Sequence, residues 1–248
     1  MELSLTGHRV LVVGASGGIG QEIANSLDAE GARLAVTATS AESVAGPGHA
    51  IALDLTDSAS VESGVADAVE HLGGLDALVV SAAHSAFGSL WESGREHLRR
   101  QLEVKYVGVA DLCKAAASHM EDGGSIVLLT GIAAEIPFGG NPAGGAANAA
   151  LTHLTKLLAM ELAHRRIRVV AVSPGFTRTS RFDSFSGNQI ASIEESIPLG
   201  RIAEPAEIAS VVTFLISPRA NYITGTTVVV DGGRSLTGTP PVRQEGEP

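Results

Sequence analysis

A glycine-rich segment near the start of the chain has the residue types that a phosphate-binding loop needs. Glycine has no Cβ and tolerates positive φ, so a pyrophosphate can approach the backbone N–H groups at the N-terminus of a following helix. The apolar stretch 10–13 precedes the segment, and Ile19, Ile23 and Leu27 recur at helical spacing after it. This order of strand, turn and helix predicts a dinucleotide-binding loop. Its residues are Gly14, Ser16, Gly17, Gly18, Ile19 and Gly20.

The end of the second apolar stretch bears on which dinucleotide is bound. An acidic residue there would bind the ribose hydroxyls of NAD and repel the 2′-phosphate of NADP. The chain has Thr39 and Ser40 at this point and no acid, and both hydroxyls can donate to a phosphate. The stretch also lacks an arginine, with Arg33 only at its start. We therefore expect a mild preference for NADP(H) over NAD(H), and an empty site stays an alternative.

The elements that must position this loop are those of an α/β fold. Apolar runs of strand length alternate with amphipathic helical patterns, which is typical of a parallel sheet whose connections cover both of its faces. We expect a single Rossmann-like, doubly wound parallel β-sheet with helices on both faces. The expected strands are 10–13, 34–37, 50–54, 77–81, 125–129, 169–173 and 227–230.

Length and composition are those of one domain. The 248 residues, 44% of them hydrophobic, can bury one large core without disulfides. We expect this domain at 1–235. A flexible tail is expected at 236–248, because its prolines and alternating charges leave little that can pack.

Composition also argues against several function classes. The single cysteine, Cys113, excludes a disulfide framework and a cysteine metal cluster, so we expect no metal and a cytoplasmic location. With 27 acidic against 17 basic residues, the formal charge of -10 opposes nucleic-acid binding. The N-terminus carries no targeting pattern, and no apolar run approaches about 20 residues, so no membrane association is expected.

Further motifs follow the expected strands, at 54–55, 76–83, 173–179 and 231–233. Together they resemble those of the short-chain dehydrogenase/reductase family, and the resemblance runs from Leu5 to about Arg234. It implies a nicotinamide dinucleotide cofactor and assigns parts of its site. Asp54 and Leu55 would hold the adenine, the turn at Ser81, Ala82 and Ala83 would pack on the adenosine ribose, and Pro174, Gly175, Thr177 and Thr179 would hold the nicotinamide carboxamide.

The chain departs from this family where the family does its chemistry. In the resembled pattern a tyrosine and a lysine lie one helical turn apart, so that the ammonium lowers the phenol pKa while it binds the ribose. Gly144 stands at the tyrosine position and Asn148 at the lysine position. The serine that would orient the carbonyl is replaced by Gly131, 13 residues before Gly144, and the asparagine of the preceding helix by Lys105.

A shifted copy of the pair is also absent from the sequence. The two tyrosines, Tyr106 and Tyr222, are followed four residues later by Ala110 and Thr226. The standard mechanism with tyrosine and lysine is therefore not expected to operate, and the active site is interpreted as degenerate.

Two residues are candidates for a substitute proton donor. Lys105, if desolvated, can protonate a carbonyl oxygen or hold a phosphate or an acidic substrate group. Its alternative role is to fill space and pair with an acid such as Glu135. By analogy with the family, His84 would lie on the nicotinamide side of the cleft, and its alternative role is that of a loop residue with a satisfied hydrogen bond.

Three functions stay open. The favoured one, by a small margin, is a noncatalytic or weakly active subunit of a dehydrogenase/reductase assembly. The second is a divergent NADP(H)-dependent oxidoreductase that uses Lys105 or His84, and the third is a non-redox cyclase, isomerase or lyase. The expected partner is a small-molecule substrate or an active relative of this family. The resemblance implies a homo- or hetero-oligomer, dimer or tetramer, formed through the helices at 100–120 and 146–164 and the segment 222–233.

Overall fold

The expected seven-stranded parallel sheet is present in the computed structural model, which describes residues 3–82, 89–137 and 140–237. The sheet order is β3-β2-β1-β4-β5-β6-β7, and all strand pairs are parallel. The direction of winding reverses between β1 and β4, which leaves a crevice beyond the carboxyl ends of these strands. The strands are β1 (Arg9–Val13), β2 (Arg33–Ala38), β3 (His49–Ala52), β4 (Leu75–Val80), β5 (Met120–Leu129), β6 (Arg168–Pro174) and β7 (Thr227–Val230).

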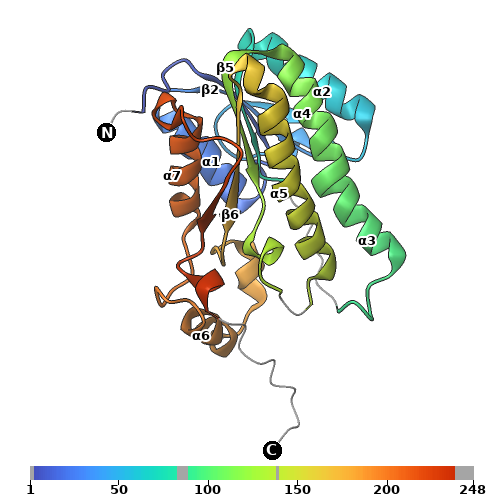
Figure 1. Ribbon diagram of the computed structural model, residues 1–248, viewed down its shortest axis with the longest axis vertical. Coiled ribbons are helices and arrows are strands. Elements are labelled where there is room, and N and C mark those ends of the chain that lie inside the picture. Colours follow the sequence, from blue (N-terminus) through green and yellow to red (C-terminus); the bar gives the residue numbers. More distant parts are fainter. Residues whose placement is uncertain (1–2, 83–88, 138–139, 238–248) are drawn as a thin grey trace, which may run out of the picture.

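Helices cover both faces of the sheet. Figure 1 shows α1 and α7 on one side and α4 and α5 on the other, with α6 beyond the lower end of the sheet. The helices are α1 (Gly18–Ala29), α2 (Ser58–Leu72), α3 (Arg95–Leu102), α4 (Gly108–His119), α5 (Pro142–Leu162), α6 (Gly187–Glu195) and α7 (Pro205–Ile216). None of the helices in the described part of the chain has the length and apolar content needed to cross a membrane.

The two faces form two separate hydrophobic clusters because side chains alternate across each strand. Val10 and Val12 of β1 pack with the α1 and α7 side, together with Ile23. Leu11 and Val13 belong to the cluster that contains residues of α2, α4 and α5. The apolar strand runs in the sequence therefore correspond to strands that are buried on both faces, as expected for a doubly wound sheet.

Two strands, β3 and β4, end earlier than expected. β3 ends at Ala52 rather than Asp54, because the backbone N–H of Asp54 donates to Ser60 Oγ (3.0 Å) instead of to a neighbouring strand. β4 ends at Val80, although the N–H of Ser81 still donates to Val13 (2.8 Å). These differences place Asp54 and Ser81 just beyond the sheet, at the edge where a ligand would bind.

The segment 100–120, expected as a helix, is interrupted. Between α3 and α4 the chain forms a π-helical turn, η2 (Glu103–Val107), which inserts an extra residue into the helical turn. Lys105 is buried in this turn, while Tyr106 and Val107 beside it are exposed. The expected boundary between domain and tail at residue 235 stays a prediction, since residues 238–248 lie outside the described part.

Candidate functional site

A cavity of about 940 Å³ occupies the crevice at the carboxyl ends of the strands. It brings together most of the residues that were expected to bind the cofactor. Ser40 and Gly175 do not line it, and Ala83 and His84 lie outside the described residues. The expected residues that line it are Gly14, Ser16, Gly17, Gly18, Ile19, Gly20, Thr39, Asp54, Leu55, Ser81, Ala82, Lys105, Gly131, Gly144, Asn148, Pro174, Thr177 and Thr179.

The glycine loop is shaped by two contacts that exclude a side chain. Gly14 has a φ of 88°, and a Cβ added to it would lie 2.5 Å from the backbone nitrogen of Ala82. A Cβ on Gly20 would lie 2.2 Å from the carbonyl oxygen of Gly14. The N-cap of α1, Gly17, provides no side-chain hydrogen bond, so the first amides of the helix remain available to an anion. The loop therefore fits a pyrophosphate.

At the expected adenine end, Asp54 is held by its own turn. Its Oδ1 accepts from the N–H and from the hydroxyl of Thr56, both at 2.8 Å. Both bonds lower the pKa of Asp54, and the bond from the Thr56 backbone N–H has the larger effect. Arg100 donates to the Thr56 hydroxyl (3.2 Å) and lines the cavity at this end. A charged Asp54 and a buried Leu55 thus face the space assigned to the adenine.

The end of β2 contains a carboxylate that the sequence argument did not consider. Ser40 donates its hydroxyl to Glu42 (2.5 Å), and this bond is the largest cause of a lowered Glu42 pKa. Thr39 lines the cavity, but Ser40 does not. The negative charge of Glu42 beside these hydroxyls works against a 2′-phosphate, so the two observations at this strand end oppose each other.

The loop after β6 closes over the glycine loop. A Cβ on Gly18 would lie 3.1 Å from Cγ2 of Thr179, so these two segments, far apart in the sequence, are neighbours. Thr177 is buried and donates its hydroxyl to the Gly175 carbonyl (3.2 Å). Gly175 itself donates its N–H to Val230 (2.9 Å), which fixes the turn to β7. The loop is therefore held in place over the end of the cavity assigned to nicotinamide.

Lys105 lies in the cavity wall, 7% exposed. Its ammonium donates to Asn148 Oδ1 of α5 (2.5 Å) and to the Thr130 carbonyl after β5 (3.1 Å). Its acceptors are thus Asn148 and Thr130, whereas Glu135, the acid named as its alternative partner, is exposed and does not line the cavity. Lys105, at the asparagine position of the family pattern, is therefore in direct contact with Asn148, at its lysine position.

Gly144 and Gly131 leave the adjoining wall without side chains. Gly144 lies in the first turn of α5, where its N–H donates to the N-cap, Asn141 Oδ1 (3.1 Å). An added Cβ at Gly144 would lie 2.2 Å from that oxygen. Tyr106 and Tyr222 are both exposed and do not line the cavity. Within the described residues, no phenol lines this cavity.

Burial, and to a lesser extent the positive charge of Arg181, lower the pKa of Lys105 from 10.5 to about 8. The folded chain therefore holds this proton less tightly than the unfolded chain. Between pH 8 and 10.5 the unfolded state binds more protons, and the free energy of unfolding should rise with pH. We expect Lys105→Met to unfold with a higher free energy than the wild type below pH 8. Between pH 8 and 10.5 this difference in the free energy of unfolding should decrease by about 3 kcal/mol.

Urea unfolding of both chains at pH values on either side of the window measures this effect. Cys113, whose pKa is raised to about 12 by burial, makes stability fall at alkaline pH, but it is present in both chains and cancels in the comparison. A difference in stability that does not change with pH would show that Lys105 keeps its ordinary pKa.

The segment after β6 adds further residues to the cavity wall. Arg181, Phe182 and Phe185 line the cavity, with Phe176. Phe182 and Phe185 contact each other (ring centroids 5.2 Å apart). Arg181 is the only basic residue between 180 and 198, and this feature of the sequence could have drawn attention to it.

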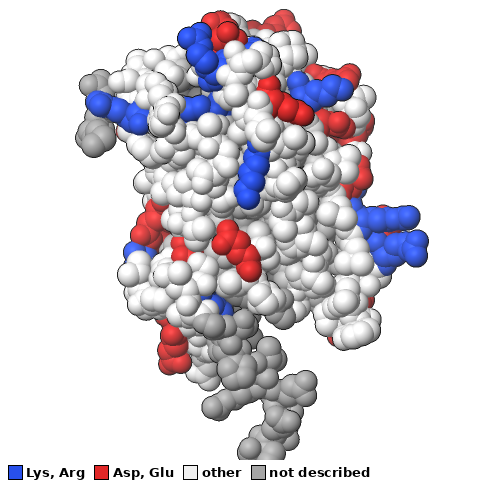
Figure 2. Space-filling view, in the orientation of Figure 1, with Lys and Arg blue, Asp and Glu red and all other residues white. Residues whose placement is uncertain are grey.

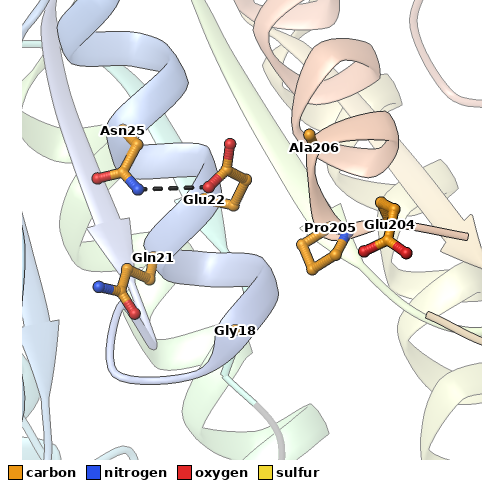
Figure 3. A pocket seen from close by; sticks show the side chains of 7 residues that line it. All are labelled: Gly18, Gln21, Glu22, Asn25, Glu204, Pro205 and Ala206. Atoms are coloured by element: carbon orange, nitrogen blue, oxygen red, sulfur yellow. Dashed lines mark hydrogen bonds between the residues drawn. The ribbon is translucent and has the colours of Figure 1, made fainter. Parts of the chain in front are cut away.

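Another hollow, of about 440 Å³, lies on the surface between α1 and the start of α7. Figure 3 shows Gln21, Glu22 and Asn25 on α1, across from Glu204 and Pro205. Asn25 donates to Glu22 (3.3 Å), and the lining carries two carboxylates and no basic residue. Such a lining is unsuited to phosphate, so we assign the dinucleotide to the larger cavity.

On the two helices that were expected to form subunit contacts, several apolar residues belong to the core of the chain itself. Leu112, Leu151 and Leu154 are buried within the cluster on the α4 and α5 side. The apolar side chains that α5 exposes are instead Leu157 and Met160. In Figure 2 much of the central surface is uncharged, and charged side chains gather toward the upper end and the edges.

The comparisons with known proteins agree with this architecture. A family model described as enoyl-(acyl carrier protein) reductase matches residues 14–235. The chain belongs to the short-chain dehydrogenase/reductase family. It is 33% identical to oxidoreductase UcpA of Salmonella typhimurium, covering 94% of this chain and 96% of that protein. It is 35% identical to the 3-oxoacyl-[acyl-carrier-protein] reductase FabG of Escherichia coli, covering 93% and 98%.

Solved structures of short-chain dehydrogenases/reductases have the same fold. The enzyme of that name from Serratia marcescens superposes with a TM-score of 0.87 at 36% identity, covering 93% of this chain and 99% of that one. The expected sheet and its covering helices are thereby confirmed. This short-chain dehydrogenase/reductase fold places the dinucleotide crevice and Lys105 in one cavity.

Proposed function

We propose that the chain is a nicotinamide-dinucleotide-binding subunit that does not by itself carry out ordinary carbonyl reduction. One contrast carries this proposal. The glycine loop keeps the close contacts that make room for a pyrophosphate, whereas Gly144 and Gly131 present no side chain to the other end of the cavity. The glycines at 14 and 20 keep the backbone amides at the start of α1 open to a phosphate group, which supports dinucleotide binding.

The residues that would hold the dinucleotide are the ones that line the cavity on either side of the glycine loop. The amides at the start of α1 would bind the pyrophosphate, Asp54 the adenosine, and Thr179 the carboxamide. When bound, such a cofactor supplies or accepts a hydride. The chain's own contribution would be to bind and orient it, because a phenol that could exchange a proton with the reacting oxygen is missing from the described wall.

The absence of a positioned general acid lowers a reaction rate by a factor of known order. A general acid contributes typically about 10²–10⁴-fold to a rate. Without one, reduction of a carbonyl would be slowed by this factor, which leaves a noncatalytic or weakly active subunit. The exposed Leu157, Met160, Tyr106 and Tyr222 support a dimer or tetramer, in which an active relative of the family would supply the turnover.

A second candidate function is favoured by the state of Lys105. Its pKa of about 8 lies near the working range of a general acid, and it lines the cavity. In a divergent oxidoreductase, Lys105 would donate the proton from its ammonium and recover it from solvent. His84 stays a predicted alternative donor outside the described residues, and the non-redox functions stay predictions without a supporting contact.

Titration calorimetry with NADP⁺, NADPH, NAD⁺ and NADH, followed by NADPH oxidation with a small 3-oxo ester, tests the proposal. We expect binding in the micromolar range and turnover close to the background. If the second candidate is correct, there is turnover and Lys105→Met abolishes it. Absence of binding to all four nucleotides would overturn the proposed function.

The same titration decides the cofactor preference. Thr39 lines the cavity and its hydroxyl favours a 2′-phosphate, whereas the Ser40 hydroxyl donates to Glu42 and the charge of Glu42 opposes a 2′-phosphate; from the absence of an acid at the strand end itself we propose a small preference for NADP(H). In the matched variant Glu42→Gln, the affinity for NADPH should rise while that for NADH stays unchanged. Equal effects on both nucleotides would show that Glu42 does not face the 2′ position.

A further inference from the structure

A buried positive charge in the cavity has only neutral acceptors. The ammonium of Lys105 donates to an amide oxygen, Asn148 Oδ1, and to a backbone carbonyl, that of Thr130. It has no ion pair within the described part of the chain. Burying a cation without a counter-ion is costly, because the lost hydration is not replaced by an opposite charge. The geometry therefore leaves a place for an anion beside Lys105.

A second cation lines the same cavity. Arg181, in the turn after β6, is close enough for its positive charge to disfavour the charged form of Lys105. The chain as a whole carries 27 acidic residues, yet the only carboxylate in the described cavity wall is Asp54. Asp54 is engaged with Thr56 at the adenine end. An anion beside Lys105 would compensate this buried cation, and the positive charge of Arg181 in the same cavity wall would add to the attraction.

Apolar side chains and glycines also line this cavity. Phe176, Phe182 and Phe185 line the cavity from the same segment as Arg181. Gly131 and Gly144, on the side of Lys105, leave room that side chains would otherwise fill. The site therefore combines a charged end with an aromatic wall, which suits a small molecule with an acidic group and an apolar body.

We propose that this end of the cavity binds a small carboxylate-bearing molecule, with its carboxylate between Lys105 and Arg181 and its apolar part against Phe176, Phe182 and Phe185. The inference builds on the proposed function, in which the dinucleotide fills the end formed by the glycine loop and Asp54. A phosphate of the dinucleotide is the other source of negative charge. It is assigned to the glycine loop, where the amides of α1 already provide for it.

The test compares carboxylic acids with their amides, which have the same shape and no charge. Acetate, hexanoate, phenylacetate and 4-phenylbutyrate, each with its amide, are titrated into the protein with and without NADP⁺. At least one carboxylate should bind with a 1:1 stoichiometry and about tenfold more tightly than its amide, since hydrogen bonds to charged groups are the stronger ones. If no carboxylate of the series binds more tightly than its amide, the proposal is wrong.

Variants locate the site. Lys105→Met and Arg181→Gln should each remove the advantage of the carboxylate, whereas Lys114→Met, which removes an exposed cation of α4, should preserve it. Binding of NADP⁺ to each variant is measured in parallel. The proposal would be overturned if Lys105→Met no longer binds NADP⁺ and the wild type binds carboxylates no more tightly than amides. Lys105 would then bind the dinucleotide rather than a carboxylate. If the wild type binds no nucleotide at all, the proposed function is wrong. The ratio of the affinities for each carboxylic acid and its amide still tests this inference.

Discussion

Installing the four family side chains should raise NADPH-dependent reduction of a small 3-oxo ester by about 10²–10⁴-fold, the usual contribution of a positioned acid. The changes are Lys105→Asn, Gly131→Ser, Gly144→Tyr and Asn148→Lys. A tyrosine at 144 and a lysine at 148 lie one turn apart on α5, so that the ammonium lowers the phenol pKa. The contact between Lys105 and Asn148 suggests that exchanging the two keeps the ammonium in the same cluster.

The structure adds a fifth change to this design. A Cβ at Gly144 would lie 2.2 Å from Asn141 Oδ1, so the design includes Asn141→Ala, which removes this contact without requiring the Asn141 side chain to rotate away. Loss of this N-cap costs about 1 kcal/mol, which a domain of ordinary stability tolerates. The matched control carries phenylalanine instead of tyrosine at 144 and should lose the gain. A variant that folds and binds NADPH but gains no activity would show that these four side chains do not account for the low turnover that we propose.

Replacement of Gly20 by alanine should abolish dinucleotide binding and lower the free energy of unfolding by about 1–3 kcal/mol, the usual cost of overpacking. The added methyl group would meet the carbonyl oxygen of Gly14 at 2.2 Å, and the loop can relieve this contact only by moving away from the helix. The amides that should bind the pyrophosphate would then no longer converge. Calorimetric titration and urea unfolding measure the two effects.

Gly187→Ala is the matched control, since a Cβ there meets no atom within 4 Å. This variant should bind the nucleotide as the wild type does. Unchanged affinity in Gly20→Ala would mean that the nucleotide, if bound, does not use the glycine loop.

Lys105 is assigned two roles, and they compete. A carboxylate beside its ammonium would favour the charged form and raise the pKa of Lys105. A lysine held in the charged form by its ligand is a poor proton donor near neutral pH. Binding of a carboxylate would therefore favour the noncatalytic function over the divergent oxidoreductase.

The fold was predictable from the sequence because its signal is local. Strands that are buried on both faces read as continuous apolar runs, and the glycine loop follows the first of them. Strand ends were less predictable, since Asp54 leaves the sheet through a bond to Ser60 that depends on the start of α2. Residues for the cofactor end could be predicted one by one because the resembled motifs are short and contiguous, and most of them line the cavity, although Ser40 and Gly175 do not.

The substrate end was less predictable. Lys105 and Asn148 are 43 residues apart, and their contact requires α5 to pack against the π-helical turn. Neither the turn nor the contact has a periodic pattern in the sequence. Glu42 was overlooked for a different reason. It stands two residues beyond Ser40, and its influence depends on how the loop after β2 folds back.

The N-cap of α5 also constrains how this chain can change over evolutionary time. Because Asn141 occupies the space beside Gly144, a mutation that introduces tyrosine at 144 must displace the Asn141 side chain from its capping position. A mutation that removes Asn141 first weakens the helix and brings no catalytic benefit. A tyrosine at 144 would therefore disturb the hydrogen bond that begins α5, so this wall of the cavity and the start of the helix do not change independently.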